Sequence, residues 1–447
     1  MKDSCEISVV SLGCAKNQVD SEIMLGILSR AGYRITDQKE QADIIVINTC
    51  GFIESAKTEA IEAILAAAAC KKNGRCRAVI AAGCLAQRYA EEIKKELPEV
   101  DAILGISGYE NILEAVEACL AGERYEYSEF TGDISYLNRP RILAGPAGSA
   151  YLKISEGCDN RCAYCAIPDI RGPFRSRKKE DVLSEARRLA LAGVKELILV
   201  AQDTSRYGTD LYGKPALAEL LYALNGIHGI EWIRILYLYP DEIAEELIDA
   251  MRSCEKVLPY VDLPLQHISA GILRAMHRRG GPNEIRSVLQ KFRERLDGCV
   301  LRTSFIVGFP GETEEDFSEL EAFVKEVRFD RLGVFPYSPE EGTPAFRMKN
   351  KVSASLKKTR FDRLMALQQE ISAEKNRGRI GKIYDVLVEG ISEDGIFYYG
   401  RSYAEAPDVD GRIYFTALEP LQIGNIVKIE ILIAEEYDLT GRQICVE

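Results

Sequence analysis

The chain has 447 residues, of which 47% are hydrophobic and 28% are charged. These proportions are those of an ordinary folded protein and exclude collagen-like, low-complexity and disordered chains. A chain about three times as long as a ~150-residue domain is expected to form two to four domains. Its 57 basic and 69 acidic residues give a formal net charge of -12, which argues against broad non-specific binding to a phosphate backbone.

The sequence predicts a cytoplasmic protein without a membrane partner. Its hydrophobic runs are shorter than the ~18 residues that a membrane span needs, and the first ten residues lack the longer apolar stretch of a secretory signal. Thirteen cysteines, an odd number, fit poorly with a disulfide framework. Metal or redox chemistry is therefore the better explanation for them.

In the first ~125 residues, short apolar runs alternate with stretches of helical periodicity. The runs cover residues 7–14, 42–50 and 77–84. This alternation predicts βα units and an open parallel sheet. Each run ends on a cysteine, and we call these three the strand-end cysteines: Cys14, Cys50 and Cys84. Because open α/β sheets bind ligands beyond the carboxyl ends of their strands, the three residues are expected to converge.

A Gly- and Pro-containing stretch at residues 126–149 predicts a linker, with a domain boundary near residue 145. Beyond it, strand-like runs recur with helical segments between most of them. The six runs are 151–155, 196–202, 232–239, 258–266, 300–308 and 331–338. This repetition predicts a partial or full (β/α) barrel, with chemistry on the loops that follow its strands.

The last part of the chain changes pattern twice. Residues 352–377 have apolar positions at helical spacing among many charges, which predicts a long amphipathic exit helix. From about residue 380, short alternating runs broken by Gly, Pro and Asp predict a small antiparallel β-barrel. The expected fold class is therefore α/β with a small β-barrel, divided into three domains over residues 1–145, 146–378 and 379–447.

The loop after the first barrel strand reads SEGCDNRCAYCAIP and holds three cysteines, which we call the loop cysteines: Cys158, Cys162 and Cys165. Three thiolates within eight residues suit an iron–sulfur cluster. Zinc is the weaker interpretation, because its structural sites use two separated pairs and the chain's three histidines are far from this loop. Simple packing as small apolar residues is disfavoured by the polar residues 159–161. A four-iron cluster with three protein ligands leaves one iron open to a small molecule.

Cys-x3-Cys-x2-Cys after the first strand of a (β/α) barrel resembles the radical S-adenosylmethionine superfamily. The resemblance implies a [4Fe-4S] cluster whose open iron binds the methionine moiety of S-adenosylmethionine, with Tyr164 beside the adenine. The cofactor would supply a 5′-deoxyadenosyl radical while the protein orients and dries the site. By family position, Gln202 and Asp203 are further cofactor contacts, with a structural loop role as the alternative. Beyond the cluster ligands, no residue is assigned a catalytic role.

The three-domain arrangement resembles the methylthiotransferases over nearly the whole length, with a TRAM-like barrel at the carboxyl end. This implies that the strand-end cysteines hold a second [4Fe-4S] cluster, which carries the transferred sulfur. The stretches AQDTSRYG (201–208) and RSYAEAPDVDG (401–411) resemble the protein-modifying branch. That branch inserts a methylthio group at the β-carbon of an aspartate in small-subunit ribosomal protein twelve, using an electron donor such as flavodoxin or ferredoxin. The other cysteines are interpreted as structural: 5, 70, 76, 119, 254, 299 and 445.

Two other functions are alternatives to modification of a ribosomal protein. One is the same methylthiotransferase chemistry on a transfer-RNA adenosine, and the other is a cluster-bearing scaffold that binds RNA and catalyses no reaction. Residues 380–447 contain 5 basic and 13 acidic residues, a net charge of -8. An RNA-tethering barrel should be basic, so the acidic tail favours a basic protein partner. We expect tail acids such as Glu405, Asp408 and Asp410 to form the docking surface. Formation of 5′-deoxyadenosine would exclude the scaffold.

Four basic residues flank the loop cysteines: Lys153, Arg171, Arg175 and Arg177. They either bind a carboxylate of the cofactor or substrate, or form a solvated basic patch, which is the default.

The glycine-rich stretch 305–317 is either a cofactor-contacting turn or a capped strand-to-helix turn. His267 follows the fourth barrel strand and is left unassigned.

Overall fold

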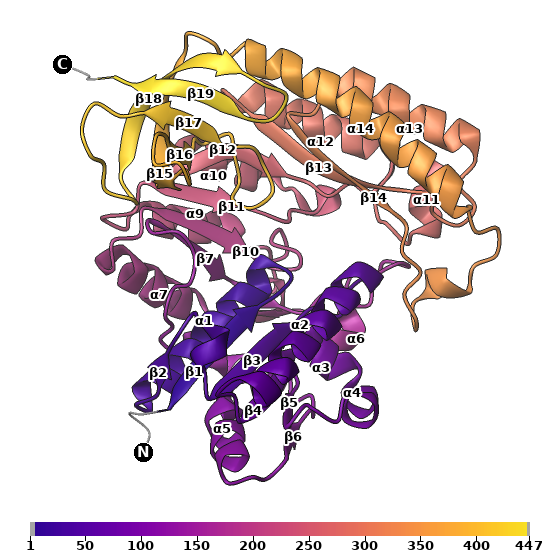
Figure 1. Cartoon of the computed structure of the whole chain (residues 1–447). Coiled ribbons are helices and arrows are strands. Elements are labelled where there is room, and N and C mark those ends of the chain that lie inside the picture. Colours follow the sequence, from indigo (N-terminus) through magenta and orange to yellow (C-terminus); the bar gives the residue numbers. More distant parts are fainter. Residues whose placement is uncertain (1–4, 445–447) are drawn as a thin grey trace. The chain divides into compact units, whose positions relative to one another are not determined.

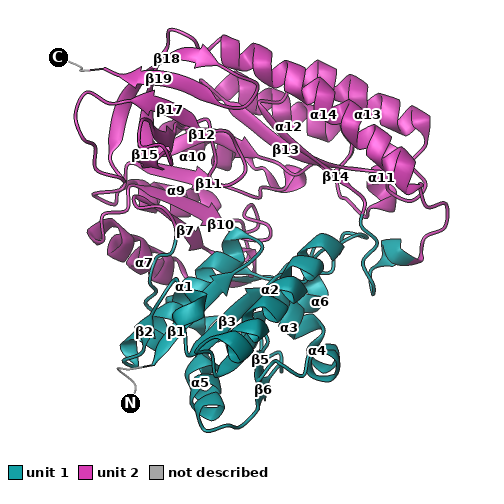
Figure 2. Ribbon diagram, viewed as in Figure 1, with its two compact units in different colours: residues 1–144, 155–177, 338–346 teal, residues 145–154, 178–337, 347–447 magenta. Residues whose placement is uncertain are grey.

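The computed structural model describes residues 5–444, so Cys445 lies outside the described residues. The chain forms two compact units, coloured separately in Figure 2. Unit 1 comprises residues 1–144, 155–177 and 338–346, and unit 2 comprises residues 145–154, 178–337 and 347–447. The segment with the loop cysteines therefore belongs to the same compact unit as the strand-end cysteines. The division into three domains remains a prediction.

Unit 1 contains a six-stranded parallel sheet in the order β2-β1-β3-β4-β5-β6 (Figure 1). Its strands are β1 (Glu6–Ser11), β2 (Arg34–Ile35), β3 (Ile44–Thr49), β4 (Ala78–Gly83), β5 (Ala102–Leu104) and β6 (Tyr125–Tyr127). The three apolar runs expected from the sequence are β1, β3 and β4. The open parallel sheet is thus confirmed, and the three additional strands are only two or three residues long.

Strands β3 and β4 are buried along their whole length, as a parallel sheet covered on both faces requires. Ile45 and Ile47 of β3 share a hydrophobic core with Ala60 and Ile64 of helix α2. The helices of unit 1 are α1 (Ala15–Arg30), α2 (Glu54–Asn73), α3 (Cys84–Arg88), α4 (Ala90–Glu96), α5 (Ile112–Leu120) and α6 (Ile167–Arg171). A short antiparallel pair, β8 (Ser155–Glu156) and β9 (Arg175–Ser176), closes the ends of the segment that carries the loop cysteines.

Unit 2 contains a second six-stranded parallel sheet, in the order β14-β13-β12-β11-β10-β7. The strands are β7 (Ser149–Lys153), β10 (Glu196–Val200), β11 (Trp232–Ile235), β12 (Val257–Asp262), β13 (Val300–Val307) and β14 (Arg331–Pro336). Each matches one of the six predicted runs. Within the described chain this sheet is open, so the barrel is partial rather than full.

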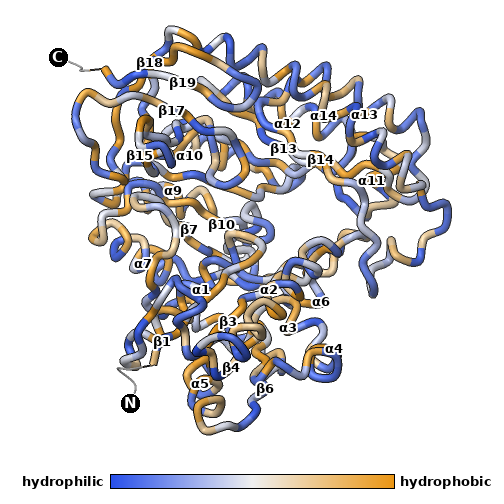
Figure 3. The backbone as a smooth tube through the Cα atoms, viewed as in Figure 1, coloured by the Kyte–Doolittle hydropathy of each residue, from blue (hydrophilic) through white to orange (hydrophobic). Residues whose placement is uncertain are grey.

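Helices follow the strands of this sheet and complete the β/α repetition. They are α7 (Lys179–Leu191), α8 (Thr209–Tyr212), α9 (Leu217–Asn225), α10 (Glu245–Ser253), α11 (Ala270–Ala275), α12 (Pro282–Arg295) and α13 (Glu314–Val327). The exit helix α14 (Ala354–Arg377) starts where the Ser353 hydroxyl accepts a bond from the amide of Leu356, at 3.3 Å. Figure 3 shows hydrophobic residues recurring along α14 among hydrophilic ones, as expected for an amphipathic helix. No helix in residues 5–444 has the length and apolar character to cross a membrane.

The carboxyl-terminal module is a closed five-stranded barrel in the order β15-β16-β17-β19-β18. Its strands are β15 (Ile383–Ile391), β16 (Tyr398–Arg401), β17 (Ile413–Thr416), β18 (Ile426–Ala434) and β19 (Leu439–Gln443). The predicted small antiparallel β-barrel is confirmed, with the difference that β17 and β19 pair in parallel. An odd number of strands cannot alternate in direction all the way around a closed barrel, so one parallel pair is unavoidable. Val386, Phe415 and Ile429 belong to its hydrophobic core.

The small barrel is joined to the larger sheet by buried ion pairs within unit 2. The Glu196 carboxylate on β10 accepts bonds from Arg234 Nε at 2.8 Å and from Arg401 Nη2 at 2.7 Å. Glu405 accepts a bond from Arg331 Nη2 at 2.7 Å. Burial alone would raise the pKa of both carboxyl groups, but the neighbouring guanidinium groups outweigh it and lower each pKa to about 2.

These contacts correct the expected role of the tail acids. The side chains of Glu405 and Asp410 are 1% and 3% exposed, so they do not form a docking surface. Asp410 instead accepts a bond from the Tyr260 hydroxyl at 2.6 Å. Asp408 is exposed and accepts a bond from the Tyr151 hydroxyl at 3.0 Å. The stretch 401–411 therefore contains much of the connection between the small barrel and the sheet. Composition alone could not show this, since Glu405 and Asp410 are buried against partners that are distant in the sequence.

Candidate metal centres

The strand-end cysteines lie at the carboxyl edge of three neighbouring strands. Cys14 separates β1 from α1, Cys50 follows β3, and Cys84 starts α3 directly after β4. Since β1 pairs with β3 and β3 pairs with β4, the fold brings the three residues to one edge of the sheet. This is the arrangement that the sequence predicts. Their role as metal ligands remains a prediction.

Glycines directly precede Cys14 and Cys84, where the backbone turns and neighbouring groups approach closely. Gly13 has a φ of +90°, and a Cβ there would lie 2.7 Å from Cys50 Cβ and 3.1 Å from its sulfur. Gly83 has a φ of +94°, and its Cβ would lie 2.3 Å from Asn48 Oδ1. Each glycine directly precedes a strand-end cysteine. The sharp turn and the close approach both require glycine at these two positions.

The side-chain amide of Asn17, on α1, connects all three strand ends. Its Nδ2 donates to the carbonyl oxygen of Leu12 at 3.0 Å and to that of Thr49 at 2.9 Å, near Cys14 and Cys50 respectively. Its Oδ1 accepts a bond from the Cys84 thiol at 3.7 Å. Sequence inspection missed this residue, because nothing in its neighbourhood distinguishes it from an ordinary helical asparagine.

The thiols differ in acidity. Burial and the nearby Cys84 thiol raise the pKa of Cys50 to about 12, and burial also raises the pKa of Cys84. For Cys14, burial is outweighed by Lys16, Arg171 and backbone amides, and the pKa is lowered. Metal binding requires thiolates. Binding of a metal by the strand-end cysteines would therefore release the thiol protons that burial retains by raising the pKa values of Cys50 and Cys84. Within residues 5–444, no three His, Cys, Asp or Glu side chains are grouped closely enough to hold a metal ion as they stand.

The donor chemistry nevertheless fits a cluster. Both triplets are composed purely of sulfur ligands, which is the ligand set of iron–sulfur centres. The Cys50 thiol also has space beside it that a side chain at Gly13 would fill. The residues present therefore suit the two expected [4Fe-4S] groups.

The loop cysteines lie on a segment whose two ends are joined by hydrogen bonds. The amide of Cys158 donates to the carbonyl of Gly172 at 3.1 Å, and the amide of Cys165 donates to that of Cys162 at 3.0 Å. Asp159 Oδ1 accepts a bond from the amide of Phe174 at 3.0 Å. Together with the β8–β9 pair, these bonds hold the three cysteines within one compact loop.

The default interpretation of the flanking basic residues as a solvated patch is wrong for three of them. Arg171, Arg177 and Lys153 are 1%, 3% and 0% exposed. Only Arg175 is half-buried, with its guanidinium 5.1 Å from the centre of the Phe130 ring. Charged side chains tolerate such burial when they are paired, and Arg171 pairs with Asp20, which lies 151 positions away in the sequence.

The candidate cofactor contacts are distributed over both units. Tyr164 lies in unit 1 and is half-buried. Gln202 and Asp203 follow β10 in unit 2, and Asp203 is fully buried, with its carboxylate accepting a bond from the Ser205 hydroxyl at 2.5 Å. Their contact with S-adenosylmethionine remains a prediction.

Hydrogen bonds to the Glu312 carboxylate fix the glycine-rich turn after β13. Glu312 accepts bonds from the amide of Gly308 at 2.9 Å and from Arg360 Nη1 at 2.7 Å. Thr313 and Asp316 then cap helix α13 reciprocally. These bonds support the capped-turn interpretation. His267 is fully buried, and its Nδ1 accepts a bond from the amide of Ser269 at 3.0 Å.

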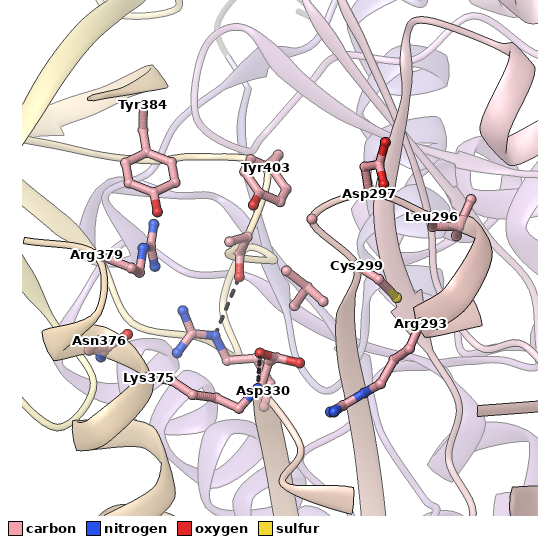
Figure 4. Close-up of a pocket in the computed structure, with 14 residues that line it drawn as sticks. Arg293, Leu296, Asp297, Cys299, Asp330, Lys375, Asn376, Arg379, Tyr384 and Tyr403 are labelled. Atoms are coloured by element: carbon pink, nitrogen blue, oxygen red, sulfur yellow. Dashed lines mark hydrogen bonds and ion pairs between the residues drawn. The ribbon is translucent and has the colours of Figure 1, made fainter. Parts of the chain in front are cut away.

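A cavity of about 490 Å³ lies elsewhere in unit 2, at the amino ends of β13 and β14 (Figure 4). Its lining includes Arg293, Cys299, Asp330 and Lys375. The Lys375 ammonium is paired with Asp330 at 2.6 Å, so part of the lining charge is already neutralised. Because the sequence predicts chemistry at the carboxyl ends of these strands, this cavity is separate from the expected site.

Three family models match the chain in succession. They are described as "Uncharacterized protein family UPF0004" over residues 6–105, "Radical SAM superfamily" over residues 152–324 and "TRAM domain" over residues 380–444. A ribosomal protein uS12 methylthiotransferase RimO from Acetivibrio thermocellus is 54% identical to the chain over 446 residues, which is 98% of both proteins. A protein of the same name from Pelotomaculum thermopropionicum is 52% identical and covers 98% of this chain and 99% of its own. The chain belongs to the RimO methylthiotransferase family.

Solved structures support the fold at much lower identity. The radical S-adenosylmethionine methyltransferase TsrM from Kitasatospora setae has a TM-score of 0.56 at 14% identity, over 76% of this chain and 74% of TsrM. The cobalamin-dependent S-adenosylmethionine radical enzyme OxsB has a TM-score of 0.51 at 14% identity, over 82% of this chain and 56% of OxsB. At these identities the likeness concerns the fold alone, and it agrees with the α/β class predicted for this RimO family member.

Proposed function

We propose that the chain is a radical S-adenosylmethionine methylthiotransferase that modifies the β-carbon of an aspartate in ribosomal protein uS12. The observation that carries the proposal is the full-length identity of 54% and 52% to two proteins named as uS12 methylthiotransferases. The placement of two three-cysteine sets in one compact unit supports it.

When bound, two [4Fe-4S] clusters and S-adenosylmethionine would supply the radical that removes one hydrogen of a C–H bond. They would also supply the sulfur and the methyl group of the methylthio group that takes its place. The chain's own residues hold and shield these groups. The closed loop between β8 and β9 presents the loop cysteines, and the turn at Gly13 leaves space beside Cys50. Asn17 fixes the strand ends relative to one another.

The acidic surface of the small barrel suits a basic protein substrate. Its exposed acids include four glutamates, which we call the surface acids: Glu393, Glu419, Glu435 and Glu436. Such charges attract a Lys- and Arg-rich partner and repel a phosphate backbone. This favours uS12 over the alternative, a transfer-RNA adenosine. Screening over roughly 8 Å at physiological salt makes the attraction depend on ionic strength.

The experiment compares two triple variants under anaerobic, reducing conditions with uS12 and S-adenosylmethionine. Replacing the strand-end cysteines by Ala should preserve formation of 5′-deoxyadenosine but abolish the methylthio product, because the two triplets have separate tasks. The control replaces three buried cysteines without motif context, Cys76, Cys119 and Cys254, and should preserve both products. A normal yield of methylthiolated uS12 from the strand-end variant would show that these three residues only pack at strand ends.

A further inference from the structure

Arg171 lies six residues after the last loop cysteine, yet its guanidinium is buried among groups of α1. Nη2 donates to Asn17 Oδ1 at 2.6 Å and to Asp20 Oδ2 at 3.1 Å. Nη1 donates to Glu156 Oε2 at 2.7 Å. The side chain is 1% exposed, and those of Asp20 and Glu156 are 0% and 2% exposed. The charge is therefore fixed in place and shielded from water.

The same network reaches the strand-end cysteines through one atom. Asn17 Oδ1, which accepts from Arg171, also accepts from the Cys84 thiol at 3.7 Å. The other end of this amide holds the backbone near Cys14 and Cys50. In addition, Cys84 forms a small buried cluster with Ala166 and Ile170, which lie between Cys165 and Arg171. The segment that follows the loop cysteines thus packs directly on Cys84, one of the strand-end cysteines.

The electrostatics of this network depend on the guanidinium. Asp20 and Glu156 are two buried carboxylates, and the hydroxyl of Tyr136 donates toward both, at 3.2 Å and 3.1 Å. Arg171 balances one of these two negative charges. Without it, the surroundings of the Cys84 sulfur would carry one more net negative charge. Reduction of a cluster adds one negative charge, and a nearby fixed cation stabilises that charge strongly in a low-dielectric interior.

We propose that Arg171 is a positioning residue that couples the two cysteine triplets: it docks the loop segment on the strand ends and raises the reduction potential of the cluster held by the strand-end cysteines. The inference rests on the proposed function, because it requires a cluster at these cysteines. Arg171 belongs to neither triplet, but residues that are hydrogen-bonded to metal ligands commonly tune the properties of a metal centre.

The test uses full-length protein in which the loop cysteines are replaced by Ala, so that one cluster remains. A redox titration followed by electron paramagnetic resonance gives its midpoint potential. Arg171→Gln should make reduction at least tenfold less favourable, a shift of at least 59 mV to more negative potential for a one-electron couple. Arg177→Gln removes another buried arginine of the same segment, one that bonds to Asn138, and should leave the potential unchanged.

A second variant keeps the proposal testable if Arg171→Gln fails to hold iron. Asp20→Asn removes a negative charge from the same network and should shift the potential in the opposite direction, to more positive values. The proposal is overturned if Arg171→Gln and Arg177→Gln give the same potential, or if Asp20→Asn shifts it negatively or not at all. Absence of any cluster when Arg171 is intact would overturn the proposed function as well, which distinguishes the two failures.

Discussion

Glu196 offers a sharp test of how the small barrel is attached. It is the buried anion between Arg234 of β11 and Arg401 of β16, at 2.8 Å and 2.7 Å. Glu196→Gln would leave both guanidinium groups buried without that counter-charge. Removing one partner of a buried ion pair typically costs about 3–5 kcal/mol. The pKa of Glu196 is lowered from 4.5 to about 2. At 1.36 kcal/mol per pKa unit, this shift corresponds to a similar stabilisation of the ionised carboxylate in the folded state, about 3 kcal/mol.

The assay is urea unfolding followed by the fluorescence of Trp232, the single tryptophan, which lies on β11 beside Arg234. Glu196→Gln should lower the free energy of unfolding by about 3 kcal/mol. Glu219→Gln provides the matched control, because Glu219 pairs with Lys214 on the surface, where screening removes most of the interaction. This variant should unfold like the wild type. If the two variants unfolded at the same urea concentration, the buried ion pairs would not hold the barrel.

Replacing the loop cysteines by Ala should abolish 5′-deoxyadenosine formation and remove about half of the iron, since each triplet is expected to hold one four-iron cluster; continued cleavage of S-adenosylmethionine would contradict the assignment. Replacing the surface acids by Gln should raise the KM for uS12 several-fold and flatten its dependence on salt with kcat unchanged; an unchanged KM would exclude docking through these charges. The lowered pKa values of Glu196 and Glu405 mean that, as pH falls from 4.5 toward 2, the unfolded chain takes up protons that the folded chain does not. The free energy of unfolding should therefore fall over this window, and more steeply for the wild type than for Glu196→Gln; equal slopes in urea titrations across the pH series would refute the linkage.

The strands that the sequence predicts are those that contain an apolar run of several residues. All six strands of the second sheet and strands β1, β3 and β4 of the first contain an apolar run, because a parallel sheet with helices on its faces buries most of its strand positions. Strands β2, β5 and β6 escape prediction because two or three residues are too short to show a period. The one parallel pairing in the small barrel follows from closure with five strands, which a local pattern does not reveal.

The same limit applies to the site. The spacing of the loop cysteines is local and is visible in the sequence. The contact of Arg171 with Asn17 spans 154 positions, and that of Arg331 with Glu405 spans 74 positions. Residue type alone therefore suggested a solvated patch and a surface acid, where the fold instead buries each charge against a distant partner.

The most direct measurement is mass spectrometry of uS12 after anaerobic incubation with the protein, S-adenosylmethionine and a reductant. The account predicts that one aspartate gains a methylthio group in place of one hydrogen. It also predicts that uS12 stays unmodified with the variant that lacks the strand-end cysteines and with the variant that lacks the loop cysteines. Unmodified uS12 in a sample that cleaves S-adenosylmethionine, together with a methylthiolated adenosine in added transfer RNA, would contradict it.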